Sequence, residues 1–385
     1  MTSSSWIAQF PGNFVWSNAA LVTKGMAPYG AVALGEIDEV CERLRHRQDE
    51  PDAWRQEWCA LGARLEAVAA AATLDGREMT AGNYYLRAGM YYFTGERFVP
   101  PGEEKQRIGK KALECQHAGL RRRYANLEVV EVPYEGTTLP ALFLKAPDTT
   151  GPAPTVVVFD GMDNCKEMSV LFAGLEFAAR GWHTLAIDGP GQGESLRLRG
   201  LSSRHDYEVP GAAAYDYVAA RADVDARRVV VMGYSFGGYY AARIAAFEPR
   251  YAAGVAFAAL HWDLAGWQRE IKRRHDTDPR TTAQSAFHFP WVMGCPDMSA
   301  AIEKAARFSL AGVAERIACP FLVVHAENDR VVPVESARRL YQAIGSPRKH
   351  LRIFTAADGS TYHAQADNRQ VGVDYIADWI AANLP

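Results

Sequence analysis

The sequence predicts an α/β protein, in which a doubly wound, mostly parallel sheet follows a helical N-terminal domain and is interrupted by a helical cap insertion. Two observations carry this prediction. After residue 126, short apolar runs rich in valine alternate with helix-length segments, as expected of parallel strands that are covered on both faces. One gap between such runs is about 60 residues long, which exceeds an ordinary crossover connection and therefore indicates an insertion.

The helical N-terminal domain is predicted over residues 1–125, because this part of the chain shows no strand pattern. In residues 52–74 apolar side chains recur at three- and four-residue steps, the period of a helix, and Asp52 is placed to cap its start. Residues 80–94 and 103–124 predict two more helices. The aromatic residues of 80–94, which include Tyr84 and Tyr85, either line a pocket or form the core between helices.

The α/β core is predicted over residues 126–260 and 316–385, with the cap at 261–315. Two segments on either side of the turn at 135–137 indicate an antiparallel hairpin. Six apolar runs then predict the parallel strands. These runs occupy residues 155–160, 183–189, 228–234, 253–260, 320–326 and 351–356.

Composition excludes several classes of function. Lys and Arg number 42 against 45 Asp and Glu, so the chain has no global positive field for a nucleic acid partner. No run of about 18 apolar residues is present, which argues against a membrane span. The first residues lack the pattern of a secretory signal, which predicts a cytoplasmic protein. The six cysteines are not clustered as metal sites or disulfide frameworks require, so no metal is expected.

Aromatic residues in the first 50 positions are expected to be exposed and to form a docking arm. They are Trp6, Phe10, Phe14, Trp16 and Tyr29. Such an arm either closes over the cap of its own chain or grips a second copy, which makes a homodimer one of two expectations.

Ser235 is the candidate nucleophile. It lies in Gly233-Tyr234-Ser235-Phe236-Gly237, between a predicted strand and a predicted helix, which is the setting in which the G-x-S-x-G motif forms a nucleophile turn. Side chains at the two outer glycines would crowd the neighbouring strand and helix. The turn lifts the hydroxyl above the sheet edge, and the helix N-terminus behind it favours developing negative charge.

A serine hydroxyl needs a base and an acid that orients the base, and in this class of sheet they follow in the order serine, acid, histidine. Asp329 lies just past the run 320–326 and is preferred to Glu327, two residues earlier. His363 follows the last strand and directly precedes the final helix. His350 is the second choice, but it precedes that strand and so lies at the wrong end of the sheet.

The oxyanion of such a reaction needs two backbone N–H groups aimed at one point. One is the amide of Phe236, which follows the nucleophile. The other is expected from the turn after residues 155–160, where Gly161 permits close approach and the amide of Met162 is the favoured donor. Cys165, just beyond, has no base partner by position, so it is interpreted as a packing residue.

The serine motif, Asp329 and His363 resemble the triad of the α/β-hydrolase fold. The block Ile187-Asp188-Gly189-Pro190-Gly191-Gln192-Gly193-Glu194 and the helical N-terminal domain more narrowly resemble the 2,6-dihydroxypseudooxynicotine hydrolase group. Relatives of that group include fungal polyketide-shortening hydrolases and FrsA-like proteins. The resemblance extends from about residue 50 to the end of the chain. The oxyanion turn departs from the more usual Gly-Gly by having Asp160-Gly161, which leaves the second donor open.

The resemblance implies cleavage of a carbon–carbon bond next to a ketone, assisted by a glutamate in the cap, and no cofactor. Glu270 stands at the matching place; alternatively it is a surface carboxylate paired with the basic residues of 271–274. The expected substrate is a small aromatic or polyketide-like ketone that stacks on aromatic side chains. The residues predicted to bind it are Trp262, Trp267, Tyr84 and Tyr85.

Two other functions remain open from the sequence. A carboxylesterase or thioesterase would use the same triad with an oxygen or sulfur leaving group, because the acyl half of the reaction is shared. A protein-binding module that kept the fold without catalysis is allowed by the FrsA-like resemblance, although an intact serine, aspartate and histidine argue against it.

Overall fold

The computed structural model describes residues 5–259 and 262–384, which form two compact units. The helical unit comprises Met1–Leu127 and Ile271–Trp291, and the sheet unit comprises Glu128–Glu270 and Val292–Pro385. This division differs from the expected one, because the middle of the predicted cap, residues 271–291, groups with the N-terminal helices while the rest groups with the sheet. The segment 261–315 is therefore not a unit of its own.

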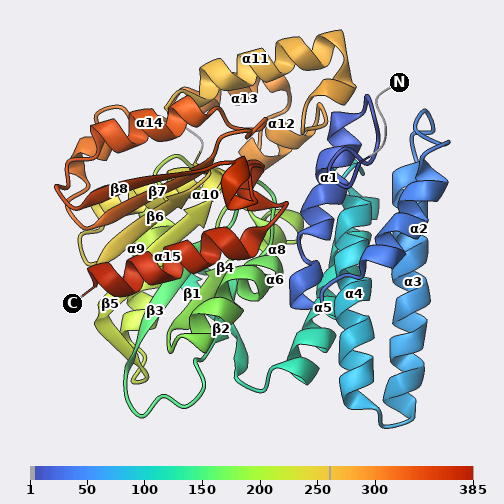
Figure 1. Ribbon diagram of the computed structural model, residues 1–385, viewed down its shortest axis with the longest axis horizontal. Coiled ribbons are helices and arrows are strands. Elements are labelled where there is room, and N and C mark those ends of the chain that lie inside the picture. Colours follow the sequence, from blue (N-terminus) through green and yellow to red (C-terminus); the bar gives the residue numbers. More distant parts are fainter. Residues whose placement is uncertain (1–4, 260–261, 385) are drawn as a thin grey trace. The chain divides into compact units, whose positions relative to one another are not determined.

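The helical unit has its long helices where the sequence pattern placed them (Figure 1). Its elements before the sheet are α1 (Phe14–Lys24), η1 (Ala27–Tyr29), α2 (Leu34–Leu44), α3 (Ala53–Leu74), α4 (Glu78–Glu96) and α5 (Glu103–Arg123). The backbones of α4 and α5 approach closely at Gly119, which has no side chain. A Cβ at this position would lie only 2.6 Å from the backbone nitrogen of Leu86 on α4. Asp52 precedes α3 but makes no side-chain capping bond, so the expected cap is absent.

The prediction that the aromatic residues near the N-terminus form an exposed docking arm is wrong for most of them. Phe10, Trp16 and Tyr29 are buried, Phe14 is half-buried, and Trp6 is 41% exposed. The rings of Phe10 and Trp16 meet edge to face at 5.4 Å, and Trp16 meets Trp54 of α3 at 5.3 Å. Because burial of large aromatic rings stabilises a core more than it costs in side-chain entropy, these residues complete the helical unit and do not form an exposed surface.

A buried ion pair joins α4 to α5 in the helical unit. Lys105 Nζ lies 2.6 Å from Glu96 Oε2 and donates a hydrogen bond of 2.8 Å to the carbonyl oxygen of Glu96. The two side chains are 2% and 0% exposed. The ammonium group also lies 4.7 Å from the ring centre of Trp291, so it ties a residue of the inserted segment to the N-terminal helices.

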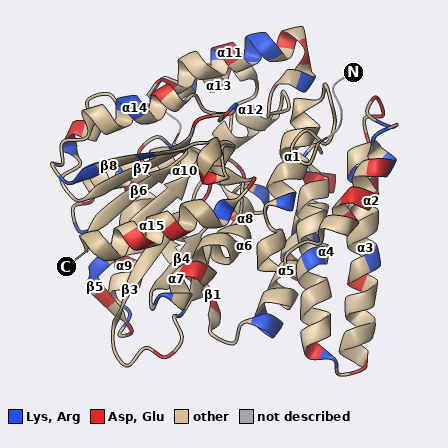
Figure 2. Ribbon diagram, viewed as in Figure 1, with Lys and Arg blue, Asp and Glu red and all other residues tan. Residues whose placement is uncertain are grey.

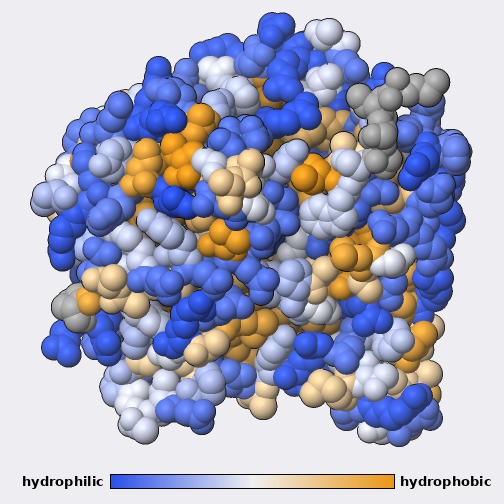
Figure 3. Space-filling model, viewed as in Figure 1, coloured by the Kyte–Doolittle hydropathy of each residue, from blue (hydrophilic) through white to orange (hydrophobic). Residues whose placement is uncertain are grey.

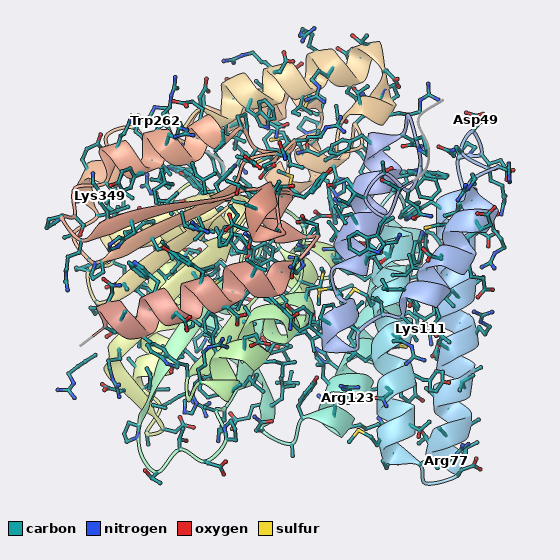
Figure 4. All side chains as sticks on the ribbon, in the orientation of Figure 1. Asp49, Arg77, Lys111, Arg123, Trp262 and Lys349 are labelled. Atoms are coloured by element: carbon teal, nitrogen blue, oxygen red, sulfur yellow. The ribbon has the colours of Figure 1, made fainter. Side chains whose placement is uncertain are left out.

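Replacing one partner of this pair is expected to destabilise the protein strongly. Lys105→Met leaves the Glu96 carboxylate buried without its cation, which costs about 3–5 kcal/mol of unfolding free energy, measurable by urea denaturation. Lys111 is a matched control, because its 2.7 Å pair with Glu66 is 40% and 26% exposed (Figure 4). Lys111→Met is expected to cost about 1 kcal/mol or less. Equal losses in the two variants would contradict this account.

The sheet has eight strands in the order β1-β2-β4-β3-β5-β6-β7-β8. Their bounds are β1 Leu127–Tyr134, β2 Thr137–Leu144, β3 Ala153–Phe159, β4 His183–Ile187, β5 Val224–Tyr234, β6 Ala253–Phe257, β7 Phe321–Ala326 and β8 Lys349–Phe354. β2 pairs with β4 antiparallel, whereas the pairs from β4 through β8 are parallel. The doubly wound, mostly parallel sheet predicted from the valine-rich runs is confirmed.

Helices cover both faces of this sheet, with α15 on one face and α9 and α10 on the other (Figure 1). The helices between and after the strands are α6 Lys166–Ser169, α7 Leu175–Ala179, α8 Gly193–Arg197, α9 Glu208–Ala219, α10 Phe236–Phe247, α14 Val334–Ala343 and α15 Arg369–Asn383. From β3 the chain passes to β4 on one side and later to β5 on the other. The carboxyl ends of β3 and β5 therefore flank a topological switch point, where open α/β sheets bind ligands.

Acidic and basic residues are interspersed along the ribbons of both units, as the near-balanced composition predicts (Figure 2). On the face drawn in Figure 3, hydrophobic residues form separate groups between hydrophilic ones. Among the helices of the described residues, none combines the length and the apolar character that crossing a bilayer requires.

Candidate active site

Ser235 occupies a strained turn between β5 and α10. Its backbone angles are φ 55° and ψ −121°, a region that costs a non-glycine residue about 1–3 kcal/mol and persists where the surroundings impose it. The glycines on either side make the turn possible. A Cβ on Gly233 would overlap the carbonyl of Gly237, and one on Gly237 would overlap the carbonyl oxygens of Phe159 and Asp160.

The structure brings Ser235 together with His363 and Asp329, each from a different strand end. His363 Nε2 lies 2.8 Å from Ser235 Oγ, and His363 Nδ1 lies 2.6 Å from Asp329 Oδ2. Asp329 follows β7, and His363 begins the short helix η6 (His363–Gln365) after β8. The histidine is thus hydrogen-bonded on both ring nitrogens, in the arrangement that lets it accept a proton from the serine.

The Asp329 carboxylate is buried and fully engaged. Its Oδ1 accepts hydrogen bonds of 2.8 Å from the backbone N–H groups of Val331 and Val332. Burial by itself raises the pKa of Asp329, but the charge and hydrogen bond of His363 bring this pKa below its ordinary value. The carboxylate therefore stays ionised at neutral pH and fixes the proton of the histidine on Nδ1.

A second histidine lies directly behind the acid. His325 on β7 is fully buried, with Nε2 3.5 Å from Asp329 Oδ2 and 3.0 Å from the carbonyl oxygen of Val332. Burial lowers the pKa of His325, so the ring is neutral and Nε2 carries the hydrogen that the carbonyl accepts. Sequence reasoning missed His325 because it lies inside an apolar strand.

The two rival residues lie in other environments. Glu327 is exposed, and its carboxylate accepts a hydrogen bond of 2.7 Å from the backbone N–H of Ala356. His350 accepts a hydrogen bond of 2.8 Å from Trp379 Nε1 on α15. The positional argument that preferred Asp329 and His363 therefore agrees with the geometry.

The turn after β3 lies against the serine. β3 and β5 pair in the register Phe159 with Gly233, so the residues that follow each strand are neighbours. A Cβ on Gly161 would lie 3.2 Å from Ser235 Cβ, which shows how closely this backbone approaches. Phe236 is the first residue of α10, where helical N–H groups have no partner within the helix. The amides of Phe236 and Met162 as oxyanion donors remain predictions.

Two family models each match more than half of the chain. The model described as "Esterase FrsA-like" matches residues 49–279, and that of the "Prolyl oligopeptidase family" matches residues 175–385. The protein is an α/β-hydrolase that belongs to both families. This identification confirms the resemblance seen in the serine motif and in the block at residues 187–194.

Individual relatives of the hydrolase agree with this assignment. It is 28% identical to hydrolase LUC6 of a Fusarium species, over 92% of this chain and 93% of that one. It is 25% identical to the 2,6-dihydropseudooxynicotine hydrolase of Paenarthrobacter nicotinovorans, over 80% and 78%. A crystal structure of a 2,6-dihydroxy-pseudo-oxynicotine hydrolase has the same fold, with a TM-score of 0.76, 22% identity and coverage of 94% and 95%.

Cys165 of the hydrolase is buried near the oxyanion turn. Burial and then the charge of Glu167 raise the pKa of its thiol, which keeps it from forming the thiolate that a nucleophile needs. The geometry agrees with its interpretation as a packing residue.

Trp262 and Trp267 line a pocket of about 240 Å³ in the sheet unit of the hydrolase. Residues of α14 or just before it form the other wall, and Trp262 lies beside this helix in Figure 4. The described lining residues are Trp262, Asp263, Gly266, Trp267, Pro333, Glu335, Ser336 and Arg339. Ser235, Asp329 and His363 are not among them, so the structure groups the two tryptophans with each other but not with the serine.

Three further predicted site residues lie on helices. Glu270 is half-buried on α11 (Leu264–Thr277). Tyr84 and Tyr85 belong to α4 of the helical unit, where their rings lie 4.4 Å from the guanidinium of Arg87 and 5.2 Å from that of Arg122. Their roles toward a substrate of the hydrolase remain predictions.

Proposed function

We propose that the protein is a serine hydrolase in which Ser235, His363 and Asp329 form the catalytic triad, and that it cleaves a carbon–carbon bond next to a ketone in a small aromatic or polyketide-like substrate. The observation that carries the proposal is the pair of hydrogen bonds on His363, 2.8 Å to Ser235 Oγ and 2.6 Å to Asp329 Oδ2. No cofactor is needed for this chemistry.

The first half of the reaction forms an acyl-enzyme. His363 Nε2 takes the proton of Ser235 as the oxygen attacks the substrate carbonyl, and Asp329 stabilises the imidazolium that results. The amides of Phe236 and Met162 would donate hydrogen bonds to the oxyanion. The strained turn at Ser235 presents the oxygen to the substrate and to the histidine at the same time.

Release of the leaving group completes the acyl-enzyme, and this step differs with the leaving group. When the tetrahedral intermediate collapses, the leaving carbon takes the bonding electrons as a stabilised carbanion and must be protonated, by His363 or by Glu270. A carboxylic acid kept neutral by its surroundings supplies such a proton efficiently. Where Glu270 is the donor, the proton that His363 took from Ser235 returns to the Glu270 carboxylate through solvent. Neutral His363 then deprotonates a water molecule, which attacks the acyl-enzyme and releases a carboxylic acid and free Ser235.

An esterase is the second candidate, and a specific observation favours it. The matching FrsA-like family is described as an esterase family, while one relative is named for the hydrolysis of 2,6-dihydropseudooxynicotine. A triad alone does not distinguish the two reactions, because the same acyl-enzyme forms in both. The bonded triad disfavours the third expectation, a binding module without catalysis.

Glu270→Gln is expected to separate the two reactions. Loss of a general acid lowers kcat for an aryl 1,3-diketone by about 10²–10⁴-fold, whereas an activated ester such as p-nitrophenyl butyrate needs no such acid and keeps its kcat within about threefold. Products of both substrates are measured by mass spectrometry for the wild type and the variant.

Asp276→Asn is the matched control, because Asp276 is a surface carboxylate on the same helix, paired with Lys272 at 2.6 Å. It should leave both reactions unchanged. Turnover of the ester alone, with Glu270→Gln silent, would mean that Glu270 is a surface residue and that the protein is an esterase.

A further inference from the structure

Two buried carboxyl groups face each other behind the oxyanion turn. Asp160 follows β3 and Asp188 follows β4, and these parallel strands pair in the register Phe159 with Ile187. Both side chains are completely buried, at the ends of neighbouring strands. Two carboxylates buried side by side repel each other, and this arrangement favours a proton on one of them.

The surrounding donors show which group is ionised. Asp188 accepts three hydrogen bonds: 2.7 Å from the backbone N–H of Lys166, 3.0 Å from Lys166 Nζ and 2.8 Å from the backbone N–H of Glu194. Asp160 Oδ2, in contrast, receives no bond from any donor in the described part of the chain. The donors therefore favour Asp188 as the anion and a neutral Asp160. Burial and then the charge of Asp188 raise the pKa of Asp160 well above its ordinary value.

The other oxygen of Asp160 is anchored to the nucleophile strand. Asp160 Oδ1 accepts hydrogen bonds from the hydroxyl of Ser169 and, at 3.3 Å, from that of Tyr234. Tyr234 immediately precedes the nucleophile, and a Cβ on Gly161 would lie 3.3 Å from its ring. One side chain thus connects the end of β3 with the end of β5, which are the two walls of the oxyanion site.

The segment after Asp188 holds the main chain of the same turn. Gln192 Nε2 donates to the carbonyl oxygen of Asp160, and the backbone N–H of Gly193 donates to that of Asn164 at 2.6 Å. Arg197 donates to the carbonyl oxygen of Asp163 at 2.7 Å. The turn between β3 and α6 is therefore fixed at several points by Gln192 and by the helix α8 that follows it.

Lys166 is the cation at the centre of this cluster. Its fully buried ammonium group lies 2.9 Å from Glu167, 3.0 Å from Asp188 and 3.0 Å from Glu194. Since these three carboxylates already outnumber the one ammonium group, a charge on Asp160 would add another buried anion without a further cation, and the arrangement favours a neutral Asp160.

We propose that Asp160 is a positioning residue, whose neutral carboxyl group, buried beside Asp188 and bonded to Ser169 and Tyr234, holds the turn of Gly161 and Met162 at the distance from Ser235 that oxyanion stabilisation requires. The inference rests on the proposed function, since it concerns the same oxyanion. Asp160 acts through the backbone of the turn and does not touch the substrate.

A pair of substitutions tests this role. In Asp160→Asn the amide is neutral, like the proposed carboxyl group, and accepts from Ser169 and Tyr234 through Oδ1, so kcat for p-nitrophenyl butyrate should stay within about threefold of the wild type. Asp160→Ala removes all these bonds. Since loss of an oxyanion donor lowers kcat by about 10²–10³-fold, displacement of the turn is expected to lower it by about 10²-fold, with KM changed by less than about threefold.

Val156→Ala is the matched control, because it opens a cavity in the same strand without touching the turn. It should lower the melting temperature and keep kcat within about twofold. A kcat of Asp160→Ala within threefold of the wild type, or an Asp160→Asn variant as slow as Asp160→Ala, would overturn the proposal.

Two readouts keep the inference separate from folding and from the proposed function. Infrared spectroscopy at neutral pH should show the carbonyl band of a protonated carboxyl group in the wild type that Asp160→Asn lacks; identical spectra would refute a neutral Asp160.

Labelling with a fluorophosphonate reports on the triad. An unlabelled wild type would contradict the proposed function, whereas a labelled wild type with Asp160→Ala acylated at the same rate would contradict only the positioning role.

Discussion

Ser235→Ala is expected to abolish nearly all hydrolysis, lowering kcat by about 10⁶-fold with little change in KM. The variant loses the oxygen proposed to form the acyl-enzyme, while the predicted oxyanion donors remain and support only a weak attack by water. The expected loss is measured with p-nitrophenyl butyrate under saturating conditions. The substitution removes only the hydroxyl group and leaves the packing around the turn unchanged. The fold and the melting temperature should therefore be retained.

Ser346→Ala is the matched control for this variant. Ser346 is another buried serine of the sheet unit, and its hydroxyl accepts a hydrogen bond of 3.2 Å from the backbone N–H of Arg348. Its removal should leave kcat within about twofold. Activity of Ser235→Ala above a few per cent of the wild type would show that another residue is the nucleophile.

Asp329→Asn is expected to lower kcat by about 10⁴-fold, because the amide does not hold His363 in the tautomer with hydrogen on Nδ1. The same substitution removes a pH-dependent contribution to stability. A carboxyl whose pKa is depressed by folding stabilises the folded state above its unfolded pKa of about 3.9, and this stabilisation is lost as the pH falls below that value. Acid unfolding monitored by circular dichroism should therefore depend less steeply on pH in the variant.

Glu327→Gln is the control for the acid, since Glu327 was the rival from sequence and lies exposed two residues earlier. It should keep kcat within about threefold. A greater loss in Glu327→Gln than in Asp329→Asn would reverse the assignment of the acid.

The nucleophile turn was predictable because its causes are local. A β-branched strand, two glycines and a helix-forming segment lie within a few residues of Ser235, and each constrains the backbone directly. The placement of Asp329 and His363 near Ser235 was predictable because the carboxyl ends of parallel strands meet at one edge of the sheet.

Features that depend on contacts across the sequence were not predictable in the same way. The buried group of Asp160, Lys166 and Asp188 forms because β3 and β4 are neighbours in the sheet, and no spacing along the chain reveals that pairing. Lys166 alone carries no signal, because a lysine at a helix start is ordinarily on the surface.

The aromatic residues near the N-terminus illustrate a further limit. Phe10 and Trp16 lie in short segments without a clear apolar period, and their burial depends on rings such as Trp54, supplied by a helix many residues away. The grouping of residues 271–291 with the helical unit has the same origin. One contact that holds this segment is that of the Lys105 ammonium group with the ring of Trp291. Neither residue indicates its partner in the sequence.

Mass spectrometry of the protein after reaction with a fluorophosphonate tests the central claim most directly. The account predicts a single adduct on the peptide that contains Ser235 in the wild type, much slower labelling in His363→Ala and none on that peptide in Ser235→Ala. A wild-type protein that carries no adduct, or an adduct confined to another residue, would contradict the assignment of Ser235 as the nucleophile.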